Sequence, residues 1–568
     1  MSTTFDGQTL IRPQARTRFN TSALVPNLPV PPSPHRTVLV GPATGGPNSL
    51  VDITTLNDIT SQLDSTSDLA EAAALALRYG ATPLSVWNVN PTTQATLTAP
   101  ASSGSAAAIS GTTTLWGTPA NQIALSLATG TTAGYQASVF NGNTGQEISA
   151  NNLALTPATV AYTGSTLTDV TITVTDTSAS VSAGATPSAV FSVSFADYPT
   201  VAQAVAYINQ QAGFAATVTD PNPNDPTTAL FDSVTAVAVT SGGVSLTANV
   251  TAVVNWLNSG AQPWLTATRG TNPPGLATPG TYTYAAGGTT GAAATSDWQA
   301  AYTGLQNEPD VLWVAPITTS SSYWAMNTAH CQFMHQLGFG RSGIVGGSLD
   351  TTVANAISAA ASLNSRYAAY LVQGVTDTNL AGVVTTFAPN VALGAILGLQ
   401  SSLPLDQSLT NKTLRTAQGL DQRFSPPVQD QLIQAGCLVL NDTRGVVSVV
   451  KGQTTAAVSP TATADAVQWS AVNETFVAEA RMNATMQAFV GKPITSTTVA
   501  AQVQHAILLT LQTLATAPHA ILFAAPTLAQ IVVTITGTVI TATAPASPVL
   551  PADFVTVMLS ASVDTAAA

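Results

Sequence analysis

A long stretch with almost no charge divides this chain into parts of unlike composition. Residues 92–290 hold a single basic residue, Arg269, against seven acidic residues. The sequence on either side alternates strand and helix patterns, with strands predicted at 38–42, 84–89 and 311–315. A change this abrupt indicates a domain inserted into a loop of another domain. We therefore predict an α/β unit that begins before the stretch and is completed after it.

The predicted fold is a multi-domain α/β (α+β) protein. An inner mixed-sheet core domain is interrupted by an inserted antiparallel β-rich outer domain, and extended strand arms lie at both ends. Strands that alternate with helices favour a mixed or parallel sheet covered by helices, whereas period-two alternation inside the insertion favours antiparallel strands. The predicted parts are an N-terminal arm (1–36), the core domain (37–91 and 291–530), the inserted domain (92–290) and a C-terminal strand arm (531–568).

Helix signals recur mainly outside the insertion. Asp68 with Glu71, and Ser296 with Gln299, are spaced like capping boxes at helix starts. Helices are predicted at 69–79, 201–210, 253–258, 296–305, 323–337, 350–363, 471–489 and 497–514, and further strands at 343–345, 368–372, 438–440, 446–450, 531–542 and 554–559. In the last helix Val503, Ile507, Leu511 and Leu514 recur at helical spacing, which is typical of one face packed on a protein core.

The charge balance excludes several classes of partner. The chain has 15 basic and 27 acidic residues and a net charge of −12, whereas a nucleic-acid partner requires clustered Lys and Arg. The Pro-rich N-terminal arm is the exception, because Arg12, Arg16, Arg18 and Arg36 face only Asp6. It is interpreted as a solvated flexible arm, or alternatively as an arm that docks on an acidic neighbour.

Cysteine usage and hydropathy give no sign of export or membrane insertion. Cys331 and Cys437 lie far apart in apolar contexts and are predicted to be buried free thiols. The N-terminus has no apolar core of a signal peptide. Residues 493–552 contain no charged residue, yet glutamines and histidines interrupt them before an apolar run long enough to span a membrane is complete.

No constellation of catalytic residues is found. The loop 41–46 follows a strand but lacks the Lys-Ser/Thr of a phosphate loop, and no G-x-S-x-G motif occurs. His330, Cys331 and His335 are interpreted as packing residues rather than zinc ligands. The acidic pairs Glu308/Asp310 and Glu474/Glu479 are interpreted as solvated faces or interface charges. We predict no catalytic, metal-binding or cofactor-binding residue and no enzymatic activity.

Several passages, taken in order, resemble the contractile tail sheath proteins of bacteriophages and related injection machines. The resemblance covers residues 38–91 and 286–493, and the insertion is not matched in detail. The passages that carry it are 38–47, 72–89, 286–291, 297–301, 308–311, 329–331, 341–346, 409–412, 435–440 and 489–493.

The resemblance implies a mechanical function. Sheath subunits polymerise as a six-fold helical assembly around a tail tube, and contraction drives the tube through the host envelope. The implied partners are further copies of the chain, the tail tube protein, and baseplate and neck or terminator proteins, without nucleic acid, cofactor or direct membrane insertion. The implied location is the virion tail, assembled in the host cytoplasm.

The same resemblance suggests two sets of contact residues. The predicted tube-facing residues are Glu474, Glu479, Arg481 and Lys492. The arms are predicted to add strands to the sheets of neighbouring subunits, and the residues proposed for this are Phe5, Leu10, Ile531, Val533, Ile535, Val539, Phe554, Val555 and Val557.

Three alternatives stay open at this point. The first is the sheath of a phage-like bacteriocin or extracellular contractile injection system, which would work in the same way. The second is a secreted Thr/Ser-rich surface adhesion protein, and the third is a hydrolase.

Overall fold

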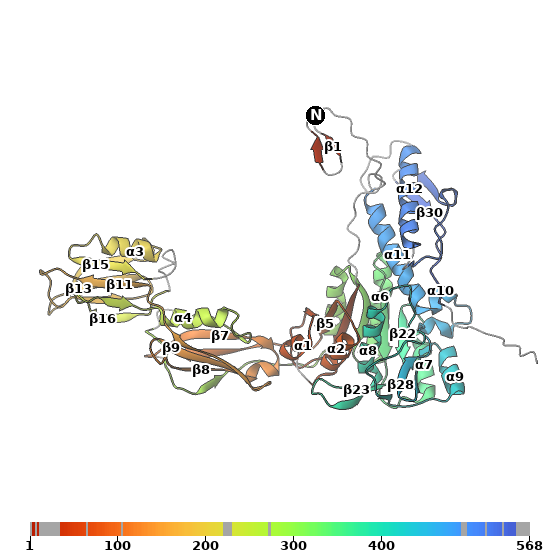
Figure 1. Ribbon diagram of the computed structural model, residues 1–568, viewed down its shortest axis with the longest axis horizontal. Helices are drawn as coiled ribbons and strands as arrows, with labels where there is room; N and C mark the ends of the chain where they lie inside the picture. Colours follow the sequence, from red (N-terminus) through yellow and green to blue (C-terminus); the bar gives the residue numbers. More distant parts are fainter. Residues whose placement is uncertain are drawn as a thin grey trace, which may run out of the picture.

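The computed structural model describes residues 3–5, 8–10, 35–63, 66–103, 106–219, 230–270, 274–489, 497–516, 520–536 and 539–551. The protein consists of an α/β body and two smaller β-rich bodies that extend from it in a row (Figure 1). We call the α/β body, residues 35–90 and 291–551, the core domain. Its mixed sheet and the antiparallel sheets of the insertion confirm the predicted fold class.

The core domain is built on one seven-stranded sheet that joins the two halves of the chain. Strand β3 (Arg36–Gly41) pairs in parallel with β5 (Leu84–Asn88) and with β20 (Val311–Pro316). β20 follows the insertion, so the sheet is closed by residues from both sides of it. The other strands are β4 (Leu50–Ile53), β21 (Ser342–Gly346), β22 (Ala368–Leu371) and β26 (Cys437–Leu438), in the order β26-β22-β21-β20-β3-β5-β4.

Helices cover both faces of this sheet, which explains why its strands are continuous apolar runs. Along β3, Leu39 faces one hydrophobic cluster, while Val38 and Val40 face another. On the first face lie α2 (Asp68–Arg78) and α8 (Pro389–Ser402), and on the other lie α5 (Thr295–Gly304), α6 (Ser321–Gln336) and α7 (Val353–Leu363).

The remaining core-domain elements flank this sheet. They are α1 (Leu56–Gln62), β23 (Val375–Thr378), β24 (Val384–Phe387), β25 (Gly419–Leu420), α9 (Pro426–Gln434), β27 (Leu440–Thr443), β28 (Val446–Val449), α10 (Ala464–Val467), α11 (Trp469–Gln487), α12 (Thr497–Leu514), β29 (Val532–Thr536) and β30 (Val539–Thr543), with the 3-10 turns η3 (Leu305–Asn307), η4 (Thr455–Val458) and η5 (Leu528–Gln530). The short strands β1 (Thr3–Phe5) and β2 (Gln8–Leu10) form an antiparallel pair near the N-terminus.

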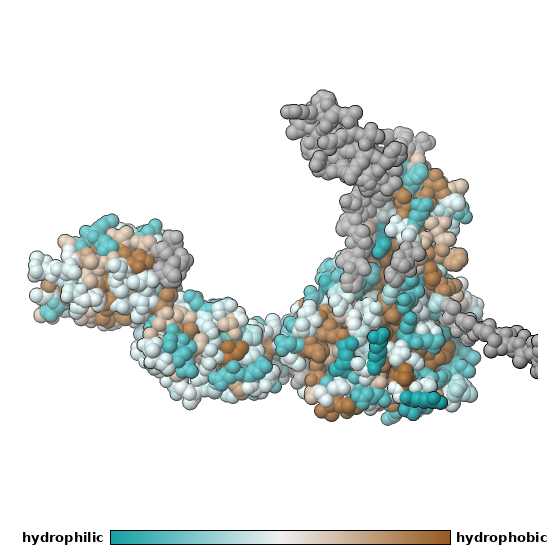
Figure 2. Space-filling model, viewed as in Figure 1, coloured by the Kyte–Doolittle hydropathy of each residue, from teal (hydrophilic) through white to brown (hydrophobic). Residues whose placement is uncertain are grey.

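The insertion contains two hydrophobic cores rather than the one β-domain that the sequence predicted. The proximal module consists of β6 (Gln94–Pro100), β7 (Ala107–Trp116), η2 (Thr118–Gln122), β8 (Ile123–Thr129), β9 (Tyr135–Asn141), β10 (Gln146–Leu153), α4 (Asn249–Asn258), β18 (Leu265–Arg269) and β19 (Tyr282–Tyr284). The distal module consists of β11 (Ala158–Tyr162), β12 (Thr171–Val174), β13 (Ser178–Ala183), β14 (Ser188–Ser194), α3 (Val201–Ile208), β15 (Phe214–Val218), β16 (Val234–Ala238) and β17 (Val244–Leu246). In the sequence, the distal module is therefore inserted into the proximal one. Residues of intermediate hydropathy, drawn in pale colours, dominate the visible face of both modules (Figure 2).

A hydrogen-bonded joint attaches the proximal module to the core domain. The buried Asn88 side chain accepts from the backbone N–H of Ala43 (2.9 Å) and donates to the carbonyl of Gly45 (2.8 Å). The two connecting chains pair at the joint, where the Thr93 N–H donates to the Thr289 carbonyl (3.0 Å). The Thr92 hydroxyl donates to the Gly46 carbonyl (2.7 Å), so the loop after β3, which lacks the phosphate-loop residues, contacts the chain where it enters the insertion.

The starts of four helices differ from the prediction. Ser67, and not Asp68, caps α2 by accepting from the Ala70 N–H. In α5 it is the Asp297 carboxylate that accepts from the Ala294 N–H (2.8 Å), so the predicted roles of Ser296 and Gln299 are wrong. α7 begins after Thr352 instead of at Asp350, because the Thr352 hydroxyl accepts from the Asn355 N–H. α4 begins at Asn249, earlier than predicted.

Two further findings concern the cysteines and the search for membrane-spanning helices. Cys331 and Cys437 are free and buried, as predicted. Within the described parts of the chain, no helix is long and apolar enough to cross a membrane.

Helices α2 and α8 pack closely against each other in the core domain. At Gly394 and Gly398, an added Cβ would lie only 2.1 Å from the Ala72 carbonyl oxygen and 2.3 Å from the Ala76 carbonyl oxygen. These glycines therefore let the α8 backbone rest directly on α2.

We expect Gly394→Ala to destabilise the core domain by about 1–3 kcal/mol, because the helices must separate to accommodate the methyl group. Urea unfolding measures the change. Gly419→Ala is the control, because an added Cβ there meets nothing closer than 3.9 Å; equal stability of the two variants would contradict the close packing.

Candidate assembly surface at the C-terminal helices

The C-terminal helices α11 and α12 extend the core domain beyond its sheet (Figure 1). Trp469, Val472 and Phe476 anchor the first half of α11 in the main core cluster. The predicted face of α12, formed by Val503, Ile507, Leu511 and Leu514, is buried in the same cluster, which confirms the helical spacing.

Strands β29 and β30 form an antiparallel hairpin that packs on α12, with Val532 opposite Thr543. The Gln504 side chain on α12 donates to the carbonyls of Leu528 (2.8 Å) and Ile531 (2.7 Å), just before the hairpin. The predicted single strand over 531–542 is therefore wrong. Gly537, between two β-branched runs, was the sequence signal for two strands.

After the hairpin the chain returns to the helices. The Phe523 N–H donates to the Ser547 carbonyl (2.9 Å), and the Val549 N–H donates to the Ile521 carbonyl (3.2 Å). We call residues 545–551 the return segment. Leu550, close to its end, is 51% exposed.

The return segment lies against Glu474, which the sequence predicted to face a tube. Glu474 is fully buried, and neither carboxylate oxygen has a good hydrogen-bond partner. Burial raises its pKa to about 8; the backbone N–H of Val549 opposes the rise, and the charge of Asp406 adds to it. Glu474 is thus buried in this conformation, with Val549 of the return segment beside it, and its contact with a tube stays a prediction.

The other predicted tube-facing residues lie farther along α11. The Glu479 carboxylate is 3.0 Å from Nδ1 of His335 and its side chain is 40% exposed. Arg481 is half-buried, and burial lowers its pKa. Glu479 and Arg481 thus stay candidates, while Lys492 lies outside the described residues.

The residues proposed for strand exchange differ in burial and in location. Ile531 is 1% exposed and packs in the main core cluster of its own chain, and its role in strand exchange stays a prediction. Val533 and Ile535 are half-buried in β29, and Val539 begins β30. Phe5 and Leu10 lie in β1 and β2, paired with Gln8 and Thr3. Phe554, Val555 and Val557 lie outside the described residues.

His330, Cys331 and His335 do not converge on a metal. Nε2 of His330 accepts from Nη1 of the buried Arg341 (2.8 Å), and burial lowers the pKa of His330 to about 3, so its ring is neutral. Burial raises the pKa of Cys331 to about 12. Within the described part of the chain, no group of three His, Cys, Asp or Glu residues could hold a metal ion.

The acidic residues Glu308 and Asp310 both form ion pairs with Arg36, so they do not make a free solvated face. Nε of Arg36 lies 3.0 Å from Asp310, and its Nη1 lies 3.3 Å from Glu308. These contacts fix the first residue of β3 against the start of β20.

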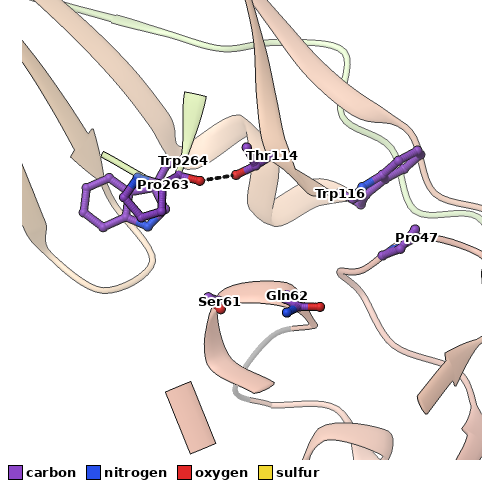
Figure 3. Close-up of a pocket in the computed structure, with 7 residues that line it drawn as sticks. All are labelled: Pro47, Ser61, Gln62, Thr114, Trp116, Pro263 and Trp264. Atoms are coloured by element: carbon purple, nitrogen blue, oxygen red, sulfur yellow. Dashed lines mark hydrogen bonds between the residues drawn. The ribbon is translucent and has the colours of Figure 1, made fainter. Parts of the chain in front are cut away.

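An open groove of about 370 Å³ lies where the core domain meets the proximal module (Figure 3). It is lined by Pro47, Ser61, Gln62, Thr114, Trp116, Pro263 and Trp264, none of which is charged. The Thr114 hydroxyl donates to the Pro263 carbonyl (2.7 Å), within the proximal module. The groove has no acid or base for catalysis.

The comparisons with known proteins agree with this architecture. No protein-family model and no curated protein matches the sequence. The solved sheath tail protein from Desulfitobacterium hafniense matches with a TM-score of 0.53 and 12% identity, over 95% of this chain and 96% of that chain. The sheath tail protein from Listeria innocua matches with a TM-score of 0.54 and 14% identity, over 91% and 92%. The chain thus has the fold of sheath tail proteins, which confirms the resemblance seen in the sequence.

The buried carboxyl of Glu474 predicts a pH dependence of stability. Its pKa rises from 4.5 to about 8 on folding, so the folded state holds a proton that the unfolded state releases above pH 4.5. Stability from this group is full below pH 4.5 and is lost progressively as the pH rises toward 8. At pH 7 we expect Glu474→Gln to be more stable than the natural protein by on the order of 3 kcal/mol.

Urea unfolding at pH 4 and pH 8 measures this effect, with Glu147→Gln, an exposed carboxylate of the proximal module, as the control. The Glu474→Gln gain should appear at pH 8 and vanish at pH 4. A gain independent of pH would show that folding does not raise the pKa of Glu474.

Proposed function

We propose that this chain is a structural subunit of a contractile bacteriophage tail sheath. It polymerises helically around a tail tube, and its contraction drives the tube through the host envelope. The observation that carries the proposal is the fold likeness to a sheath tail protein over nearly the full length of both chains. A likeness limited to the core domain would have left the insertion unexplained.

The surface of the core domain supports a polymer. The hairpin β29–β30 is a two-stranded sheet, and Val532 on it is 57% exposed. Such a hairpin offers backbone N–H and C=O groups at its edges to a strand from another copy. Head-to-tail contacts of this kind generate a helix where the rotation between copies does not close into a ring.

The proposed partners follow from this role. They are neighbouring copies in a six-fold helical assembly, a tail tube, and the baseplate and neck or terminator proteins at its ends. Glu479 and Arg481 on the less buried second half of α11, with Lys492 later in the sequence, are proposed to face the tube. The proposed location is the virion tail, assembled in the host cytoplasm, and the role involves no enzymatic step.

A phage-like bacteriocin or an extracellular injection system would use such a subunit in the same way. Neighbouring genes for a capsid and a terminase would mark the phage form.

Negative-stain electron microscopy of the purified full-length chain tests the proposal. We expect striated tubes of uniform diameter, at least when the chain is produced together with its tube protein. A chain that stays monomeric under both conditions would contradict a sheath function.

We also propose a boundary for the exchangeable C-terminal arm. Because Ile531 is buried and the return segment covers Glu474, removing residues 531–568 would damage the core domain. Removing only residues 552–568 should leave a folded monomer that forms no tubes, because the strand pattern at 554–559 is lost. Circular dichroism and negative-stain microscopy of the shorter deletion check both halves of this expectation, and normal tubes would exclude this segment from the lattice.

A further inference from the structure

Arg269, the basic residue of the insertion, reaches from one module into the other. It ends strand β18 in the proximal module. Its Nη1 lies 3.1 Å from the Asp176 carboxylate, and its Nη2 donates to the carbonyl of Phe231, both in the distal module. Within its own module, its Nη1 makes a long contact with the Gly270 carbonyl (3.4 Å).

The ion pair is removed from water. The side chains of Arg269 and Asp176 are 7% and 12% exposed. Burying a charge is costly unless an opposite charge and hydrogen bonds compensate it. The guanidinium is therefore compensated only while the two modules stay at the angle that brings Asp176 and Phe231 to it.

A second carboxylate marks the same boundary. Asp232 is 5% exposed and accepts from the backbone N–H groups of Asn249 (2.7 Å) and Val250 (3.2 Å) at the start of α4. The positive charge of Arg269 favours its ionised form, whereas burial raises its pKa. Without Arg269, the insertion would hold no basic side chain to offset the charges of Asp176 and Asp232.

The chain connections between the modules are slight. The chain crosses at residues 154–157 and returns at 247–248, where the Ala248 N–H donates to the Leu155 carbonyl (2.8 Å) and the Leu155 N–H donates to the Asn249 side chain (3.0 Å). The hydrophobic cores of the two modules are separate clusters. Two adjacent connecting segments of this kind form a hinge unless a contact away from them fixes the angle.

We propose that the side-chain contacts of Arg269 fix the distal module at one angle to the proximal module. Without them, the two modules would move about a hinge at residues 154–157 and 247–248. The inference is independent of the sheath function. It gives a structural role to Arg269, the one basic residue in an insertion that otherwise holds only acidic and uncharged residues. Each module would keep its own hydrophobic core when Arg269 is replaced.

Distances between two spin labels, one in each module of the full-length chain, test whether Arg269 fixes the angle between the modules. Labels are attached at Glu147→Cys in the proximal module and Ser188→Cys in the distal module, both exposed positions. Cys331 and Cys437 are buried, and burial raises the pKa of both thiols to about 12, so they do not compete for the label. The variants are Arg269→Met, which keeps an apolar stem, and Asp176→Asn, which keeps the shape of the partner.

Arg78→Met is the matched control, because it breaks a half-buried ion pair with Asp377 (3.0 Å) inside the core domain. We expect one narrow distance distribution in the parent and the control, and a distribution at least twice as wide in both test variants. Circular dichroism of the β-sheet signal should stay unchanged for Asp176→Asn. Distributions as narrow as the parent in both test variants would overturn the proposal, as would loss of the distal module's sheet signal in both.

Discussion

The parallel pairing of β3 with β20 is the interaction on which the rest of the structure depends. It joins Val38 to Val314 and Val40 to Pro316 across the whole insertion. Because both strands are buried on both faces, the pairing also brings the helices of the two chain halves into one core. The insertion can then leave and re-enter the core domain at adjacent points, where Thr93 bonds to Thr289. Because the two ends of the insertion lie side by side, the chain can include two further modules there without disturbing the sheet.

The sequence predicted the parts of the fold in which local pattern and final environment agree. The strands of the central sheet are continuous apolar runs, and α12 shows its buried face in the spacing of Val503 and Ile507. α8 was missed for the opposite reason: eleven of its residues are buried, so it has no polar face to give a period. The division of the insertion was missed because both modules share one Thr/Ser/Ala-rich composition.

The candidate site shows a similar limit. Glu474 and Glu479 stand five residues apart on one helix and were predicted together. The structure separates them, since the return segment covers Glu474 while Glu479 stays at the surface. A contact between α11 and residues so much later in the chain leaves no local signal. Arg269, by contrast, was conspicuous in the sequence as a lone basic residue, but its partner required the structure.

The account therefore centres on a core domain that is complete without its insertion. The most direct test replaces residues 94–284 by a short Gly/Ser linker, which the pairing of Thr93 with Thr289 allows sterically. Electron microscopy and circular dichroism of the shortened chain are the measurements. The account predicts a folded protein that assembles into tubes of smaller outer diameter. A chain that fails to fold, or that folds but forms no tubes where the full-length chain does, would contradict it.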